Sequence, residues 1–98
     1  MSFYLIEDVT HSDGYEYRHS FILNAEDTPL PSDIEQLLTA FQYSLSLDDV
    51  QGDEVWSDCR IVSCHVKSEV PERDVEVLRR YMPVISLSTV IYNLMELG

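Results

Sequence analysis

The chain has 98 residues, of which 45% are hydrophobic and ten are aromatic, a composition that excludes a disordered chain. The length predicts one domain over residues 1–98, and no apolar run approaches the roughly 20 residues of a membrane-spanning helix. Eighteen acidic residues against six Lys or Arg give a net charge of −12, which argues against direct binding to nucleic acid or anionic membranes. Met1 precedes a strand-like run without a basic segment, so we expect no signal peptide and a cytoplasmic protein.

The N-terminal stretch is predicted to form a β-hairpin around which the rest of the chain is organised. Two runs, Phe3–Val9 and Tyr15–Asn24, are predicted to be strands. The second alternates apolar with polar residues, as does a strand of an antiparallel sheet that is covered on one face. Tyr15 and Tyr17 fall on the face that we expect to be mainly buried. Ser12–Gly14 supplies the turn, because its glycine takes a positive φ at no steric cost.

The register of the hairpin depends on the length of its loop. A two-residue Asp13-Gly14 turn would pair Ile6 with Phe21, whereas a three-residue loop that includes Ser12 would pair Leu5 with Phe21. A shift of one residue exchanges the two faces of a strand. We prefer the three-residue loop, because it gathers the apolar side chains of both strands on one face.

In either register, His19 lies opposite an acidic residue, Glu7 or Asp8. A cross-strand pair of this kind contributes roughly 0.2–1 kcal/mol to a sheet, and we interpret it as structural. The alternative is the His–carboxylate pair of a small hydrolase-type enzyme, for which the sequence offers no third group.

A linker with two prolines, Asn24–Pro31, precedes the most regular predicted helix. Ser32 and Glu35 have the spacing of a capping box, with Ser32 as the N-cap residue. Apolar residues follow at the spacing of one buried helix face. These residues are Ile34, Leu37, Leu38, Phe41 and Leu45.

The second half of the chain predicts one further strand and two further helices. The alternating run Val55–Lys67 is predicted to be a strand antiparallel to one strand of the hairpin. Pro71–Met82 is predicted to be helical, because a proline begins it and another follows it. At the C-terminus we favour an extended Val84–Leu87 and a helix over Ser88–Leu97, with a short strand over Val84–Thr89 as the alternative. The predicted fold is α+β, with a three-stranded antiparallel sheet packed on two or three helices in the order β-β-α-β-α-α.

The two cysteines are expected to be free thiols. Cys59 and Cys64 fall in one predicted strand, where five residues at about 3.3 Å each separate their Cα atoms by about 16 Å. A disulfide needs Cα atoms within about 7 Å, and free thiols fit a reducing compartment. Because neighbours on a strand diverge, Cys64 and His65 do not predict a zinc site, and we expect neither a metal nor a cofactor.

Charge is the feature of the sequence that points to function. The segment 26–58 contains nine acidic residues and no Lys or Arg, whereas the rest of the chain holds nine acids and all six basic residues. The nine acids are Glu26, Asp27, Asp33, Glu35, Asp48, Asp49, Asp53, Glu54 and Asp58. A field of one sign accelerates the encounter with a partner of opposite charge.

We therefore hypothesise a non-catalytic protein-binding module whose carboxylates face a basic surface of another protein. The predicted contacts are Asp33, Glu35, Asp48, Asp49, Asp53 and Glu54. An inhibitor or adaptor of a basic, nucleic-acid-acting protein would work in this way, as immunity proteins and DNA-mimic inhibitors do. That comparison rests on charge and size alone, since the sequence carries no motif of either group.

Three alternatives stay open. In the first, the acidic surface serves solubility alone in a self-associating domain, a homodimer formed through an open sheet edge or through the apolar run Val84–Leu97. A calcium site is a second use of the acids between Asp48 and Asp58, although the spacing of an EF-hand loop fails there. Catalysis is the third, but the sequence contains neither a nucleophile motif nor a phosphate loop, and we expect no enzyme.

Overall fold

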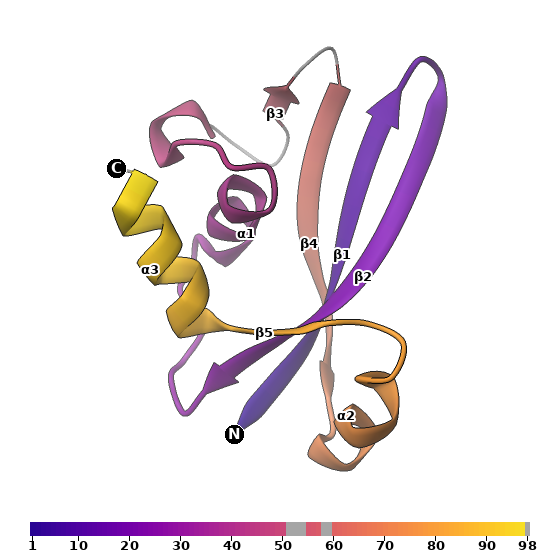
Figure 1. The fold of residues 1–98 in the computed structure, drawn as a ribbon, viewed down its shortest axis with the longest axis vertical. Helices are drawn as coiled ribbons and strands as arrows, with labels where there is room; N and C mark the ends of the chain where they lie inside the picture. Colours follow the sequence, from indigo (N-terminus) through magenta and orange to yellow (C-terminus); the bar gives the residue numbers. More distant parts are fainter. Residues whose placement is uncertain (51–54, 58–59, 98) are drawn as a thin grey trace.

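The computed structural model describes residues 1–50, 55–57 and 60–97 (Figure 1). Within these residues the chain forms a sheet, three α-helices and one short 3-10 helix, so the predicted α+β class is confirmed. No helix in these ranges is both long and apolar enough to cross a membrane. The elements in chain order are β1 (Ser2–Ser12), β2 (Tyr15–Glu26), α1 (Ile34–Gln42), η1 (Leu47–Asp49), β3 (Val55–Ser57), β4 (Arg60–Val70), α2 (Glu72–Leu78), β5 (Val84–Ser86) and α3 (Leu87–Leu97).

The sheet has five strands within the described residues, in the order β3-β4-β1-β2-β5. β1 lies at the centre and is antiparallel to both β2 and β4, as predicted, while β5 is parallel to β2. The prediction of three strands, all antiparallel, is therefore wrong. The run Val55–Lys67 holds two antiparallel strands, β3 and the first part of β4, in which Val55 pairs with Val62. The period-two alternation continues from one strand into the other, so it does not show that there are two.

The β1–β2 hairpin turns through two residues, not three. Asp13 and Gly14 both have positive φ values, 50° and 81°, as the favoured two-residue hairpin turns require. Ile6 consequently pairs with Phe21, and the preferred three-residue loop is wrong. The expectation that His19 faces an acid is confirmed, because it pairs with Asp8.

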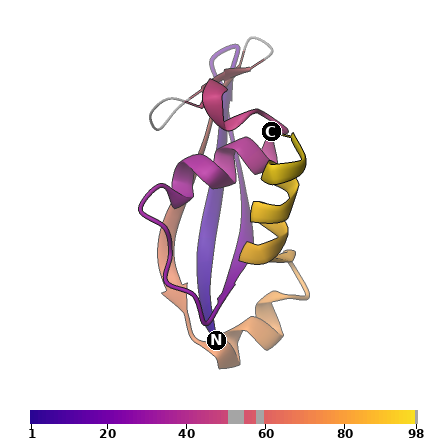
Figure 2. The same ribbon diagram turned by 90° about the vertical axis from the view of Figure 1, so that its left-hand side faces the viewer.

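The sheet is covered on both faces near the N-terminus, which explains the error in register. Figure 2 shows α1 and α3 side by side over one face. Phe21 and Leu23 point into the core beneath them, whereas Ile22 points into a second, smaller core. Leu23 and Ile22 are both fully buried, so a rule that assumes one buried face cannot choose between the registers.

The larger core joins β1, β2 and β4 to α1 and α3, with Val50 and Val55 at its edge. Its buried residues are Ile6, Phe21, Leu23, Ile34, Leu38, Ala40, Val50, Val55, Val62, Cys64, Leu87, Val90 and Leu94. The smaller core places α2 on the other face of the sheet. Its buried residues are Phe3, Ile22, Val70 and Val75.

The outer half of β2 is exposed, although β1 beside it contains the buried Asp8 and Val9. Residues 15–20 of β2 are exposed, and Tyr15 and Tyr17 keep 67% and 53% of their surface accessible. The expectation that these tyrosines are mainly buried is wrong. The helices end before they reach this part of the sheet, so alternation along the strand continues where no core exists.

The first helix lacks the predicted capping box. The N-cap residue of α1 is Asp33, without a side-chain cap hydrogen bond, and not Ser32. Leu45 lies beyond the end of the helix at Gln42, where Ser44 takes a positive φ of 55°. The carboxylate of Glu35 does not turn back to the helix start, because it bonds to β4 instead.

The other two helices are close to the prediction. α2 is shorter than Pro71–Met82, since it covers Glu72–Leu78 with Pro71 at its N-cap. α3 covers the predicted Ser88–Leu97 and adds Leu87. The extended segment before it is confirmed as well, as strand β5.

Two side chains of α1 form hydrogen bonds with the part of the β4 edge that does not pair with β3. The hydroxyl of Thr39 accepts a hydrogen bond from the Cys64 N–H at 3.0 Å and donates one to the Glu35 carbonyl at 2.8 Å. The Glu35 carboxylate accepts a hydrogen bond from the Val66 N–H at 2.8 Å. Strand N–H groups that would otherwise lack a strand partner are thus satisfied by the helix.

Thr39→Val is expected to lower the free energy of unfolding by about 1–3 kcal/mol, because the buried Cys64 N–H loses its acceptor. Valine has nearly the shape of threonine, so the change isolates the hydroxyl. Urea denaturation of both variants measures the effect, with Thr39→Ser as the control that keeps an acceptor. A Thr39→Val protein as stable as the Ser variant would contradict this role.

Candidate functional site

The structure describes three of the six predicted contact side chains, and all three lie on or beside α1 and η1. Asp33 precedes α1, Glu35 lies in its first turn, and Asp49 ends η1. Asp33 and Asp49 are exposed. The side chain of Asp48 and the whole of residues 53 and 54 lie outside the described residues.

Glu35 has a structural role that the charge pattern does not reveal. Its Oε2 accepts the Val66 N–H and lies 4.0 Å from His65 Nδ1. The side chain is still 40% exposed. Glu35 can therefore meet a partner with part of its carboxylate only, while Asp33 and Asp49 are the freer contacts.

Two of the five arginines, Arg18 and Arg79, pair with acids outside the acidic segment. The Arg18 guanidinium bonds to Glu7 and Glu16 on the hairpin. Arg79 pairs with Glu76, one turn before it, at 3.4 Å. These two cations therefore leave the negative charge of α1 and η1 in place.

An apolar hollow of about 270 Å³ lies between α1, η1 and α3. Its lining residues are Leu37, Leu47, Ile91, Leu94 and Met95. Leu47, Ile91 and Met95 are 43%, 39% and 75% exposed. Several large apolar side chains exposed at one place are typical of an interaction site.

Acidic residues lie close in the sequence to the residues of this hollow, although none of them lines it. Asp33 stands four residues before Leu37, a spacing that brings side chains onto one helix face. Asp49 follows Leu47 by two residues, and the exposed Glu96 follows Met95. The sequence analysis did not predict the hollow, because it assigned the apolar face of the first helix to the core and considered the apolar run Val84–Leu97 only as a seam for self-association.

A polar hollow of about 390 Å³ lies where the exposed half of the hairpin meets the end of α1. Its lining residues are Asp8, Thr10, Ser12, Tyr17, His19, Tyr43 and Arg60. The Tyr43 hydroxyl donates a hydrogen bond to the buried Asp8 carboxylate and lies 2.8 Å from the Thr10 hydroxyl. Burial, and then the hydrogen bond to Asp8, raise the pKa of Tyr43.

The predicted His–carboxylate pair is not assembled in this hollow. His19 stands across from Asp8 in the sheet, yet within the described ranges no ion pair joins their side chains. Asp8 bonds to Tyr43 instead. Because Asp8 and Tyr43 are 35 residues apart, no local pattern in the sequence predicts their contact.

Ser63, His65 and Glu35 are arranged in the order nucleophile, base and carboxylate, as in the catalytic triad of a hydrolase. They cannot act as a triad. Ser63 Oγ lies 3.0 Å from His65 Nε2, and His65 Nδ1 lies 4.0 Å from Glu35. Ser63 is only 3% exposed, so a substrate cannot reach its hydroxyl. The group stabilises the edge of β4.

Metal ligation finds no support among the residues that are described. In those ranges no three His, Cys, Asp or Glu side chains converge to hold an ion. Most of the acids of the calcium alternative, residues 53, 54 and 58, lie outside the ranges.

Comparison of the chain with protein-family models, with curated proteins and with solved structures finds no match. The function is therefore argued from the residues themselves.

Tyr43→Phe is expected to lower the free energy of unfolding by roughly 1–3 kcal/mol, because the buried Asp8 loses its hydrogen-bond donor. Urea denaturation measures the loss. Tyr92→Phe is the matched control, since Tyr92 is 64% exposed on α3. Equal stability of the two variants would show that the Asp8–Tyr43 bond contributes nothing.

Cys64 is expected to resist thiol reagents at pH 8 in the folded protein. Burial, and then the nearby Asp8 carboxylate, raise the pKa of its thiol to about 12, so the reactive thiolate is scarce below that pH. A Cys59→Ser variant leaves Cys64 as the one cysteine, and the colour released from a chromogenic disulfide reagent follows its reaction. Labelling as fast as that of the urea-unfolded chain would contradict the expectation.

Proposed function

We propose that the chain is a non-catalytic protein-binding module that holds a basic protein partner against α1, η1 and α3. The partner is a protein with a cationic surface, such as a nucleic-acid-acting protein that the chain inhibits or adapts. This proposal keeps the acidic residues of the sequence hypothesis and adds to them an apolar centre for the interface.

The observation that carries the proposal is the apolar hollow between α1, η1 and α3, elements that also carry exposed acids. Stable protein interfaces combine an apolar centre with a polar rim, and hot spots lie near the centre. Leu47, Ile91 and Met95 offer such a centre. Asp33 and Asp49 offer the charged rim.

The sign of the charge selects the partner. Asp33, Glu35 and Asp49 stand on the helical side of the sheet, while Arg18 and Arg79 are engaged with acids elsewhere. A surface with this charge accelerates association with cations and rejects anions. A surface that served solubility alone would not need exposed apolar side chains among its acids.

The charge contribution is tested with Asp33→Asn, Glu35→Gln and Asp49→Asn in one chain. Glutamine in place of Glu35 keeps an oxygen for the Val66 N–H, so the fold is retained. The matched control combines Asp13→Asn, Glu69→Gln and Glu72→Gln, which remove three exposed charges far from the hollow. Calorimetric titration at low salt uses a panel of basic nucleases and DNA-binding proteins as probes, with a short DNA duplex as competitor.

We expect at least one probe to bind, the duplex to compete, and the first triple variant to bind roughly tenfold more weakly, a change of about 1.4 kcal/mol. The control variant should bind like the unmodified chain. Absence of binding across the panel, or equal weakening by both triple variants, would refute the proposal.

The apolar contribution is tested separately with Met95→Ser. Met95 is 75% exposed in the free protein, so its loss should leave stability unchanged and weaken binding of the same probe. Val77→Ser is the control, since Val77 is 57% exposed on α2, over the other face of the sheet. An interface made by charge alone would be indifferent to both changes.

A further inference from the structure

One edge of the sheet is open over half of a strand. β2 runs from Tyr15 to Glu26, but β5 pairs only with its residues Ile22–Asn24. The outer edge of residues 15–21 therefore has no strand beside it within the described part of the chain. The opposite edge, on β4, is closed by β3 and by the Thr39 and Glu35 side chains.

The groups that this edge presents follow from its neighbour β5. The Ile22 N–H points outward and donates to the Pro83 carbonyl at 2.9 Å. Because backbone groups alternate along a strand, Glu16, Arg18 and Ser20 direct their N–H and C=O groups to the same side. An exposed row of this kind is a template for another strand.

We propose that a second copy of the chain occupies this edge, so that the two β2 strands pair antiparallel about a two-fold axis at Tyr17. The sheets of the two copies then form one continuous sheet. In this register the hydrogen-bonded pairs are Glu16 with the partner's Arg18, and Arg18 with the partner's Glu16. Tyr17 stands opposite the partner's Tyr17, and Tyr15 opposite the partner's His19.

Charge complementarity selects this register. The run Tyr15–Phe21 carries one acid and one base, Glu16 and Arg18. The two-fold axis places the Glu16 of each copy opposite the Arg18 of the other, which gives two pairs of opposite charge. A shift by two residues in either direction would set Arg18 against the partner's Arg18 or Glu16 against the partner's Glu16. Like charges directly across a sheet are destabilising.

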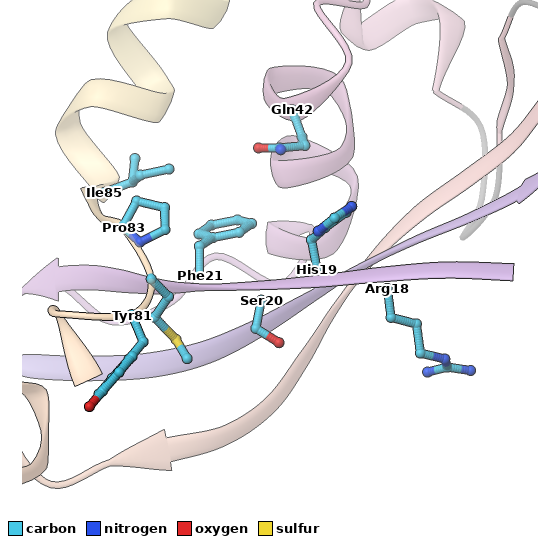
Figure 3. A pocket seen from close by; sticks show the side chains of 9 residues that line it. Arg18, His19, Ser20, Phe21, Gln42, Tyr81, Pro83 and Ile85 are labelled. Atoms are coloured by element: carbon cyan, nitrogen blue, oxygen red, sulfur yellow. The ribbon is translucent and has the colours of Figure 1, made fainter. Parts of the chain in front are cut away.

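The length of the free edge selects the same register. With the axis at Tyr17, the partner's hairpin turn lies beside Ser20 and Phe21, just before the position where Pro83 bonds to β2. A hollow of about 520 Å³ is present there, as Figure 3 shows, with Pro83 and Ile85 at one end and Arg18 at the other. A partner strand shifted toward β5 would collide with Pro83.

Dimer formation would also remove two unfavourable features of the isolated chain. It covers Tyr15 and Tyr17, which are more than half exposed, and it removes an open strand edge. It does so where the chain is locally neutral, whereas the acids at the start of α1 lie beside β4, at the opposite edge of the sheet. Two chains of net charge −12 can therefore meet here with little repulsion between their acidic segments.

The proposal is independent of the partner-binding function and is tested by a charge exchange. Size-exclusion chromatography with light scattering should show a dimer for the unmodified chain and monomers for Glu16→Arg and Arg18→Glu alone. An equimolar mixture of the two variants should form a heterodimer, because the two neighbouring arginines of one variant then face the two neighbouring glutamates of the other. The controls Glu69→Arg and Arg73→Glu should remain dimeric.

A monomeric unmodified chain, or single variants that still dimerise, would overturn the proposal. Failure of the mixture to dimerise would overturn the register. Circular dichroism of each variant identifies a monomer that has lost its fold. If a variant is unfolded, the crosslinking experiment below tests the dimer instead.

Crosslinking tests the axis directly in a Cys59→Ser chain. Tyr17→Cys should form a disulfide-linked dimer on mild oxidation, because Cα atoms of a directly opposed, non-hydrogen-bonded pair lie about 4.5 Å apart. Tyr15→Cys is the matched control on the same face, since four residues at about 3.3 Å each, or about 13 Å along the strand, would separate it from its copy. Equal crosslinking at both positions would overturn the two-fold axis at Tyr17.

Discussion

The pairing of β1 with β2 through a two-residue turn is the constraint on which the rest of the structure depends. Asp13 and Gly14 both take positive φ, and this places Ile6 against Phe21. Ile22 then faces the opposite side from Phe21 and Leu23, so one strand supplies two cores. β1 also pairs with β4 along most of its length, and α1 packs on β4.

The two halves of the hairpin have different environments, and the open strand edge lies at the border between them. Near the N-terminus both faces of the sheet are covered, and the edge of β2 is paired with β5. Toward the turn, the helices end and the tyrosines of β2 are exposed. The polar hollow around Asp8 and Tyr43 and the open strand edge both lie there.

The acidic segment serves the fold as well as the surface. Glu35 satisfies a strand N–H, so one of the carboxylates that make the chain acidic also holds α1 against β4. Asp33 and Asp49 remain exposed at the surface. Under the proposed function, these acids and the exposed apolar side chains of η1 and α3 would contribute to one protein interface.

The sequence by itself determined the α+β class, the hairpin, the approximate positions of the three helices and the acidic character of segment 26–58. These features depend on local periodicity, on turn residues and on composition, which each stretch of the chain carries within itself. Only the tertiary structure decided the register, the pairing of β3 with β4, the attachment of β5, and the roles of Glu35 and Tyr43. Each of these depends on which distant segment covers a face or meets a polar group, as when α2 buries Ile22 or Asp8 receives the hydroxyl of Tyr43, and local patterns do not encode such contacts.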